Sequence, residues 1–448
     1  MHSTDPANSL LHFAFVLHNH QPVGNLDRVF RQAFEQAYLP FVEVVEEFPG
    51  LRVVLHYTGP LLEWLEAERH EFLDRLRVLA ASGQAEILTG AFYEPILSAI
   101  PPRDRLGQIR RMTTWVEDNL GVHPRGLWLA ERVWEPHLAR DLADAGAEYC
   151  LIDDAPFERI GIDRDGLHGY YITEEDGRML RVVPIDSTLR ALIPFRLPGE
   201  TVAYLRDVAA GGSGRLATFA DDGEKLGDWP GTHKWVYQEG YLRDLFTLME
   251  DNASWLKTTT LSQFVDDVPA LGMAYVPAAS YAEMLEWSGG LWRNFLRRYP
   301  ESNQMHKLMQ RVSAKVDAMP TDRPDHEAAR TELYRGQCNC PYWHGVFGGI
   351  YLLHLRHANH AALLRAERLA DASLRGDQAW QEVTIADLDY DGTDEVLIDG
   401  RELAAVLAPA KGGHLTALSA KREAHSLLAT LSRRPEAYHE RLASGEGA

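Results

Sequence analysis

The chain has 448 residues and a formal net charge of −20, from 45 Lys and Arg against 65 Asp and Glu. Its length predicts two or three domains, and its negative field excludes the phosphate backbone of nucleic acid as an expected partner. The sequence shows neither an apolar run of the roughly 18 residues that span a bilayer nor a basic secretory leader. Three cysteines (Cys150, Cys338 and Cys340) are too few for a disulfide scaffold, so we expect a cytoplasmic protein.

The first part of the chain alternates apolar, β-rich segments with segments of helical length. The predicted strands are 12–18, 51–57, 85–90, 125–131, 148–153, 179–186 and 215–221, with a further candidate in WLKTTT at 255–260. The predicted helices between them include 27–48, 61–82, 103–120, 136–146 and 234–252. This alternation predicts a parallel sheet covered by helices, and seven such units predict an α/β fold with an incomplete TIM-like (β/α)7 barrel. A doubly wound open sheet is the alternative, although no G-x-G-x-x-G follows the first strand.

The pattern changes twice after the barrel. Helical spacing at 302–318, 324–335 and 345–375 predicts a helical domain, and alternating apolar residues with turn signals after it predict paired strands. We therefore expect a barrel at 1–272, a helical domain at 273–380 and, at 381–448, the start of a β-sandwich that is cut short.

An acidic segment in the last region mimics the start of a calcium loop. DLDYDGTDEVLI (387–398) carries aspartates at its first, third and fifth positions and a glycine at its sixth, but Ile398 stands where an EF-hand has glutamate. We therefore predict a tight turn between two strands here.

Chemically useful side chains gather where the predicted barrel strands end, which is where TIM-like barrels place their active sites. The segments are HNHQPVGN (18–25), GAFYEPIL (90–97), WLAERVWEP (128–136), IDD (152–154) and DDGEKLGDW (221–229), with QCNCPYWHGVFGG (337–349) in the helical region. Eleven Trp and 17 Tyr add flat aromatic faces, which suit neutral ligands such as sugars.

Each of these residues also has a purely structural explanation. Glu131 would be favourable at a helix N-terminus, and Asp221 and Asp222 are residue types that cap helices or form Asx turns. Single tryptophans are more often core residues than ligand platforms. His18 and His20 would point to opposite faces if their strand continued, which would make at least one of them structural.

A divalent metal is an alternative use of the strand ends. His18, His20, Asp153 and Asp154 could hold an ion in a metal-dependent hydrolase or deacetylase. Neither H-E-x-x-H nor C-x-x-C spacing supports it, so we keep this as the minority hypothesis.

Five of these segments, in this order, resemble glycoside hydrolase family 57 and specifically its 4-α-glucanotransferase/α-amylase branch. They are HNHQPVGN, GAFYEPIL, WLAERVWEP, DDGEKLGDWPGTHKWVY and QCNCPYWHGVFGGIYLLHLR. The resemblance extends over essentially the whole chain, and it implies a (β/α)7 barrel, a helical domain that completes the site and a C-terminal β-sandwich.

The resemblance also implies residue roles. It implies that Glu131 is the nucleophile and that an aspartate of DDGEK is the general acid/base. The family frame Asp-x-Glu-x-Phe-Gly falls on Asp222 to Gly227, with Leu226 in place of Phe, which selects Asp222 and makes Asp221 its neighbour. The substrate-binding candidates are His18, His20, Glu94, Trp128, Asp221, Trp229, Trp343 and His344.

This chemistry agrees with the residue types. A retaining glycosidase needs one carboxylate to attack the sugar carbon and one acid to protonate the leaving oxygen. We expect Asp221 and Glu224 to raise the pKa of Asp222 through like-charge repulsion. One departure is that Cys340 and Pro341 stand where the family often has Asp and Ala.

The sequence therefore predicts a retaining 4-α-glucanotransferase that needs neither a metal nor an organic cofactor. The alternatives are an α-amylase-like hydrolase, a glucan-binding protein without turnover and a metal-dependent carbohydrate deacetylase. The expected ligands are α-1,4-glucans or maltooligosaccharides, with neither nucleic acid nor membrane as a partner. A homodimer is one assembly that the sequence allows.

Overall fold

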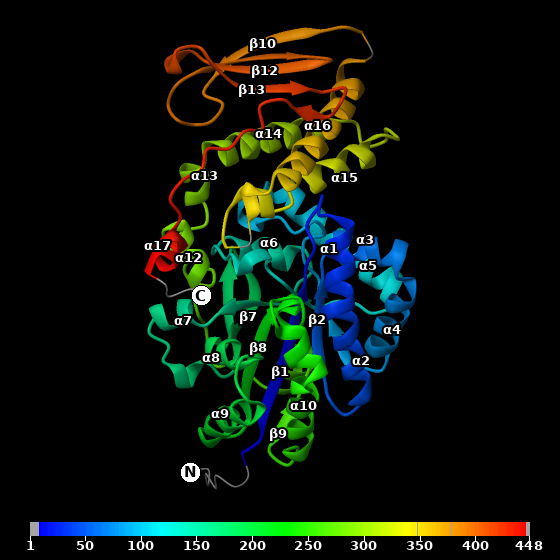
Figure 1. Cartoon of the computed structure of the whole chain (residues 1–448), viewed down its shortest axis with the longest axis vertical. Coiled ribbons are helices and arrows are strands. Elements are labelled where there is room, and N and C mark those ends of the chain that lie inside the picture. Colours follow the sequence, from blue (N-terminus) through cyan, green and yellow to red (C-terminus); the bar gives the residue numbers. More distant parts are fainter. Residues whose placement is uncertain (1–8, 347, 377, 445–448) are drawn as a thin grey trace. The chain divides into compact units, whose positions relative to one another are not determined.

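The computed structural model describes residues 9–346, 348–376 and 378–444 and divides into two compact units (Figure 1). The first unit comprises the described residues of Met1–Gln21, Leu26–Phe92 and Arg105–Tyr281. The second comprises those of Pro22–Asn25, Tyr93–Asp104 and Ala282–Ala448.

The first unit is built on seven strands of the predicted barrel. They are β1 (Leu11–Asn19), β2 (Val53–Tyr57), β3 (Ala85–Ile87), β4 (Gly126–Leu127), β5 (Tyr149–Asp153), β7 (Arg178–Ile185) and β8 (Arg215–Asp222). They lie in two sheets, one with the order β3-β2-β1-β8 and one with the order β4-β5-β7, in which a further strand, β6 (Tyr171–Glu175), lies beside β7. All seven predicted segments thus contain strands, although the fourth keeps only two strand residues.

Sparse hydrogen bonds join the two sheets at both seams. At one seam, Thr89 N donates to Gly126 O and Trp128 N donates to Thr89 O, both at 2.8 Å. At the other, Asp186 N donates to Thr218 O at 2.9 Å. The order β1-β2-β3-β4-β5-β7-β8 therefore closes on itself, which confirms the predicted incomplete (β/α)7 barrel. The alternative prediction of an open, doubly wound sheet is wrong.

Two short strands complete this unit. β6 (Tyr171–Glu175), which the sequence pattern did not reveal, pairs antiparallel with β7. β9 (Leu256–Thr258), within the eighth candidate segment, pairs parallel with the beginning of β1.

Helices follow most of the strands. In this part of the chain they are α1 (Asp27–Ala33), α2 (Leu39–Glu47), α3 (Gly59–Glu68), α4 (His70–Ala81), α5 (Pro102–Leu120), α6 (Leu138–Asp144), α7 (Ala155–Arg159), α8 (Ser187–Leu192), α9 (Pro198–Ala210), α10 (Tyr241–Asp251) and α11 (Leu261–Asp267). A π-helical turn joins α1 to α2 without a break, so the helix predicted over 27–48 is confirmed as one continuous helical segment.

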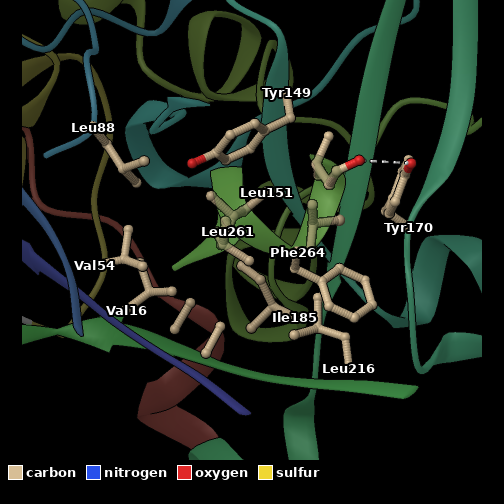
Figure 2. Close-up of a cluster of buried hydrophobic side chains, with 14 of the residues drawn as sticks. Val16, Val54, Leu88, Tyr149, Leu151, Tyr170, Ile185, Leu216, Leu261 and Phe264 are labelled. Carbon is tan, nitrogen blue, oxygen red and sulfur yellow. Dashed lines mark hydrogen bonds between the residues drawn. The ribbon is translucent and has the colours of Figure 1, made fainter. Parts of the chain in front are cut away.

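The barrel interior is an apolar core to which all seven strand segments contribute. Figure 2 shows Val16, Val54, Leu151, Ile185 and Leu216 converging from different strands. Leu261 and Phe264 of α11 join the same cluster, which is almost completely withdrawn from water. A packed interior fixes the strand positions, so the residues at the strand ends stand on a rigid rim.

The second unit combines helices with an antiparallel sheet. Its helices are α12 (Ala282–Ser288), α13 (Asn294–Arg298), α14 (Pro300–Asp317), α15 (His326–Gly336), α16 (Leu353–Arg375) and α17 (Ala437–Ser444). Its strands are β10 (Gln381–Ala386), β11 (Glu395–Gly400), β12 (Leu403–Ala408), β13 (His414–Ala420) and β14 (His425–Ser426), paired in that order (Figure 1). The predicted change from helices to paired strands is confirmed.

A buried ion cluster ties this sheet to the two long helices. Lys421, which is completely buried, lies 2.5 Å from Asp399 on β11 and 2.9 Å from Asp371 on α16. Lys315 of α14 lies 2.7 Å from Glu367 and 2.9 Å from Asp399. Because each buried acid has a cation beside it, the cluster fixes the sheet against α14 and α16.

Candidate active site

The C-terminal ends of β1, β4 and β8 bring the main candidates to the same rim of the barrel. His18 lies next to the end of β1, and its register partner across the β1–β8 pairing is Asp222. Glu131 follows β4 in a three-residue 3-10 turn, Ala130–Arg132. Parallel strands present their C-terminal ends at one edge, so these side chains share a face of the first unit.

Glu131 has an uncommon backbone conformation. Its φ is 52° and its ψ is 19°, in the left-handed region that a non-glycine residue occupies at a cost of about 1–3 kcal/mol. Ser280 Oγ donates to the Glu131 carbonyl at 2.6 Å, and Tyr281 Oη donates to Glu131 Oε2 at 3.0 Å. Both the main chain and the carboxylate are therefore held by the segment after β9. The turn is not the start of an α-helix, so the helix-terminus explanation of Glu131 is wrong.

Tyr281 lies in the electrostatic field of both Glu131 and Asp222. Burial raises the pKa of Tyr281 well above its ordinary value, and the negative charges of Glu131 and Asp222 raise it further. Arg132, which lies 4.6 Å from the centre of the Tyr281 ring, opposes them. The phenol therefore keeps its proton and donates it as a hydrogen bond, in the field of both carboxylates.

Asp221 is a buried ion-pair partner of two cations. Arg190 Nε lies 3.2 Å from Asp221 Oδ2, and Lys225 Nζ donates to the same oxygen. Burial alone would raise the pKa of Asp221, but Arg190 and Lys225 outweigh it and lower the pKa to about 2. The other oxygen, Oδ1, accepts from Asp222 N at 3.0 Å.

Arg190 and Lys225 compensate the negative charge of Asp221. Through the hydrogen bond that it accepts from Asp222 N, Asp221 also fixes the backbone of Asp222. Neither aspartate side chain caps the turn that follows β8.

Glu224 is the acid of this segment whose proton is released near neutrality. His20 N donates to Glu224 Oε1 at 2.8 Å, and Tyr38 Oη donates to the same oxygen. Burial, followed by the negative charge of Asp222, raises the pKa of Glu224 to about 7. The carboxyl therefore links the loop after β1 to the loop after β8.

The raised pKa of Glu224 predicts a pH dependence of stability. A group whose folded-state pKa exceeds its unfolded value stabilises the fold fully below the unfolded value, here 4.5, and loses that contribution as the pH rises through about 7. We expect the urea midpoint of the wild type to fall between pH 5 and 8 by more than that of Glu224→Gln, whose amide carbonyl still accepts hydrogen bonds. Glu239→Gln, which changes an exposed partner of Lys234, is the control. Parallel pH profiles in all three proteins would contradict this assignment.

His18 stacks on Trp128, and His20 and His56 stack in turn on His18. The His18 ring lies 4.7 Å from the Trp128 ring at 14°, and His18 Nδ1 is 2.8 Å from His56 Nδ1. His20 lies beyond the end of β1, and its ring stacks 5.8 Å from that of His18. The two histidines therefore do not point to opposite faces. Trp128 is only 3% exposed, so it supports the histidines from the barrel core.

Trp229 forms an aromatic pair with a residue that the sequence reasoning missed. Its ring lies 6.2 Å from that of Phe195, which is 49% exposed in the segment after α8. Lys225 Nζ lies 5.0 Å from the centre of the Phe195 ring. An exposed Phe beside a predicted sugar platform is a second flat face of the kind that sugars stack on. Its only sequence signal is an apolar residue within the loop IPFRLPG.

Glu94 and Trp343 meet in the second unit through Asn339, which the sequence reasoning also missed. Asn339 Nδ2 donates to the Glu94 carbonyl at 2.8 Å, and Trp343 Nε1 donates to Asn339 Oδ1 at 2.7 Å. Glu94 is buried and has a φ of 51°. The Trp343 ring stacks 6.3 Å from that of Trp287. In the sequence, Asn339 could have been noticed only as the central residue of the segment CNC.

His344 is held by protein groups at both ring nitrogens. Nδ1 lies 2.5 Å from Gly348 O, Nε2 contacts the Tyr438 hydroxyl, and the ring is buried. These contacts fix the segment after Trp343 against α17.

Protein groups already occupy the carboxylates of the two aspartates that the metal hypothesis requires. Arg132 Nε lies 3.0 Å from Asp153 Oδ2, and Arg190 lies 3.5 Å from Asp153 Oδ1. Asp154 Oδ2 accepts from Ser187 N and Oγ at 2.9 and 2.7 Å. Within the described ranges, no group of three or more potential metal ligands combines His18 or His20 with Asp153 or Asp154. These four side chains do not form the proposed metal centre.

Family models match three successive parts of the chain. They are glycosyl hydrolase family 57 over residues 14–277, the alpha-amylase/4-alpha-glucanotransferase middle domain over 290–370 and the corresponding C-terminal domain over 387–448. The first model alone matches more than half of the chain, and it contains the barrel rim described above.

Individual proteins agree with these models. A 4-alpha-glucanotransferase of Thermococcus kodakarensis is 41% identical over 96% of this chain and 68% of its own length. An alpha-amylase of Pyrococcus furiosus is 40% identical over the same shares. The crystal structure of 4-alpha-glucanotransferase from Thermococcus litoralis has a TM-score of 0.90 at 40% identity, covering 97% of this chain and 70% of that one.

The barrel rim and these matches place the chain among enzymes of the glycoside hydrolase class. The chain belongs to glycosyl hydrolase family 57. None of the three cysteines takes part in a disulfide in the part of the chain that the structure describes, and none of the helices there is long and apolar enough to cross a bilayer.

Proposed function

We propose that this protein is a retaining 4-α-glucanotransferase, with Glu131 as nucleophile and Asp222 as general acid/base. The observation that carries the proposal is the hydrogen bond from Tyr281 to Glu131, together with the influence of both carboxylates on the pKa of that phenol. The named activities of the T. kodakarensis and T. litoralis proteins support the choice of transfer.

The proposed reaction proceeds in two displacements. An oxygen of Glu131 forms a bond to C1 of the donor glucose while the bond from C1 to the glycosidic oxygen breaks, and Asp222 gives its proton to that leaving oxygen. The 4-hydroxyl of an acceptor glucan then loses its proton to Asp222, and its oxygen displaces Glu131 from C1. Two inversions retain the α configuration and restore both carboxyl groups.

In this mechanism the protein's own groups prepare Glu131. The Tyr281 hydroxyl and the Ser280 contact fix its carboxylate and backbone, which lowers the entropic cost of reaching the attack geometry. His20, Glu94, Trp128, Trp229 and Trp343, with His18, Asp221 and His344, remain the proposed substrate-binding set, to which we add Phe195.

Tyr281 offers a direct test of this preparation. We expect Tyr281→Phe to lower kcat about 10- to 100-fold on maltoheptaose, because a hydrogen bond to a charged group contributes about 1.5–3 kcal/mol. Tyr275→Phe removes an equivalent but exposed hydrogen bond, from Tyr275 Oη to Glu174 at 3.1 Å, and is expected to change kcat less than twofold. Equal rates for the two variants would contradict the role of Tyr281.

α-Amylase-like hydrolysis is the second candidate, because the P. furiosus relative carries that name at the same level of identity. Incubation with maltoheptaose and separation of the products by chromatography distinguishes the two activities. Products both longer and shorter than the substrate support transfer, whereas shorter products alone support hydrolysis. Absence of turnover in the folded protein would remove both.

The Phe195–Trp229 pair gives a prediction about the balance between these two outcomes. An acceptor glucan that stacks on the exposed Phe195 ring and the partly exposed Trp229 ring competes better with water for the glycosyl-enzyme. We therefore expect Phe195→Ala to lower the ratio of transfer to hydrolysis about 3- to 10-fold, the effect of losing about 1 kcal/mol of stacking. Leu197→Ala, at an exposed position two residues further on, is the control. An unchanged ratio in Phe195→Ala would exclude the pair from the acceptor site.

We also propose a cytoplasmic location, from the sparse cysteines, and α-1,4-glucans as the ligands, from membership of the family, with neither a metal nor an organic cofactor required. Light scattering of the purified chain tests the homodimer that the sequence allows.

A further inference from the structure

The turn between β10 and β11 collects carboxylates around one point. One oxygen each from Asp387, Asp389 and Glu395 lies within 4.8 Å of the other two. Calcium binds oxygen ligands at about 2.3–2.6 Å, so ligands on opposite sides of one ion are about 4.8 Å apart. The three oxygens therefore fit around a single calcium ion.

Glu395 is the member of this group that indicates a ligand. Its side chain is only 2% exposed at the first position of β11. Its Oε2 accepts from Leu388 N at 2.9 Å, whereas its Oε1 has no hydrogen-bond partner among the residues that the structure describes. A buried carboxylate oxygen without a partner is costly unless a cation or ordered water occupies the adjacent space.

The main chain shapes the turn around the other acids. Asp387 accepts from the backbone N of Asp391 and of Gly392, each at 3.0 Å, and Gly392 has a φ of 92° that glycine adopts without strain. Asp389 also accepts from Asp391 N at 3.1 Å. These bonds hold the carboxylates in place before any ion binds, which lowers the cost of assembling a site.

The ammonium group of Lys411 lies beside two of the acids in this turn. Lys411 Nζ lies 2.7 Å from Asp391 Oδ2 and 3.6 Å from Asp389 Oδ2, and its side chain is about half exposed. An exposed lysine can swing into solvent, so an ion at the cluster displaces it from Asp389 without unfolding the turn. Lys411 is therefore a competitor of the ion and not its permanent substitute.

We propose that the turn Asp387–Glu395 binds a calcium ion through the carboxylates of Asp387, Asp389 and Glu395, with water completing the coordination shell. All three ligands are oxygens, which selects a hard cation over zinc or copper. The site is independent of the EF-hand fold, because its glutamate comes from the start of a strand, three positions before Ile398. It also lies outside the proposed catalytic residues.

The ion would stabilise the second unit. The Asp389 carbonyl accepts from Asn303 Nδ2 of α14 at 2.6 Å, so fixing the turn also fixes its attachment to that helix. An ion that binds the folded state and not the unfolded one raises the melting temperature in proportion to the logarithm of its concentration.

The test uses the full chain after treatment with a chelator and dialysis. Calcium or magnesium is added in a calorimeter, and terbium luminescence excited through Tyr390, which lies in the turn, reports binding at this site. We expect the wild type to bind calcium with one equivalent, to bind magnesium more weakly and to gain melting temperature on calcium addition. Lys411→Gln is expected to bind calcium more tightly, because the competing ammonium group is gone.

Matched variants locate the site. Glu395→Gln and Asp389→Asn are expected to weaken calcium binding at least about tenfold, whereas Asp394→Asn, an exposed acid of the same turn, should remain within about twofold. Asp389 is partly exposed, so its variant gives a test even if Glu395→Gln does not fold. Absence of calcium binding in the wild type, or the same affinity in Asp389→Asn and Asp394→Asn, would overturn the proposal.

Discussion

Glu131→Gln and Asp222→Asn are each expected to abolish glucan transfer while leaving the fold intact. Loss of the nucleophile removes the covalent intermediate, and we expect kcat to fall at least about 10³-fold. Loss of the general acid/base removes proton transfer to the leaving oxygen, which contributes about 10²–10⁴-fold. Product formation from maltoheptaose measures both effects, and circular dichroism confirms folding.

Two controls separate catalysis from general damage. Asp228→Asn, in the same segment as Asp222 and hydrogen-bonded to Gln32, is expected to keep near-normal activity. With a maltosyl fluoride donor and added azide, Glu131→Ala should give the β-glycosyl azide and Asp222→Ala the α-glycosyl azide, because azide replaces a different group in each case. Wild-type rates in Asp222→Asn would reject Asp222 as the acid/base.

Asp221→Asn is expected to destabilise the first unit strongly. The substitution leaves Lys225 without its buried carboxylate and removes one of the two partners of Arg190, and breaking a buried ion pair costs about 3–5 kcal/mol. Because the folded-state pKa of Asp221 is lowered to about 2, its contribution is present above the unfolded value of 3.8. The contribution is lost as the pH falls from about 4 towards 2.

Urea unfolding at pH 7 and pH 3 checks this result. Asp165→Asn is the matched control, because Asp165 pairs with Arg215 at the surface, where such pairs contribute at most about 1 kcal/mol. We expect the loss in free energy of unfolding caused by Asp221→Asn to be smaller at pH 3 than at pH 7. A loss at pH 7 no larger than that caused by Asp165→Asn would show that Asp221 does not stabilise the unit.

The periodic parts of the fold could be predicted from the sequence. The strands were recognisable because their residues are buried on both faces and therefore form short continuous apolar runs, as in 148–153. The fourth strand was overestimated, because the chain turns through the left-handed conformation at Glu131 soon after Leu127, which apolarity alone does not reveal. The antiparallel β6 was missed because its alternating pattern, YITEE, is short and polar.

The candidate site was only partly accessible from the sequence. Motifs identified Glu131 and Asp222 as candidates, since a strand followed at once by acids marks the rim of a barrel. Tyr281, Arg190 and Phe195 carried no comparable signal, because they reach the site from segments distant in the sequence. The division at 1–272, 273–380 and 381–448 stays a prediction.

The sequence alone determined the strand–helix alternation, the strand ends that carry acids and the family, because these depend on local pattern and residue order. Only the tertiary structure decided what each acid does. Asp221, Asp222 and Glu224 are nearly adjacent in the chain, yet Arg190 and Lys225 lower the pKa of Asp221 to about 2, whereas burial and the negative charge of Asp222 raise the pKa of Glu224 to about 7. A pKa depends on desolvation and on charges within a few ångströms. The folded chain supplies the burial, and the charge of Arg190 beside Asp221, from segments that are distant in the sequence.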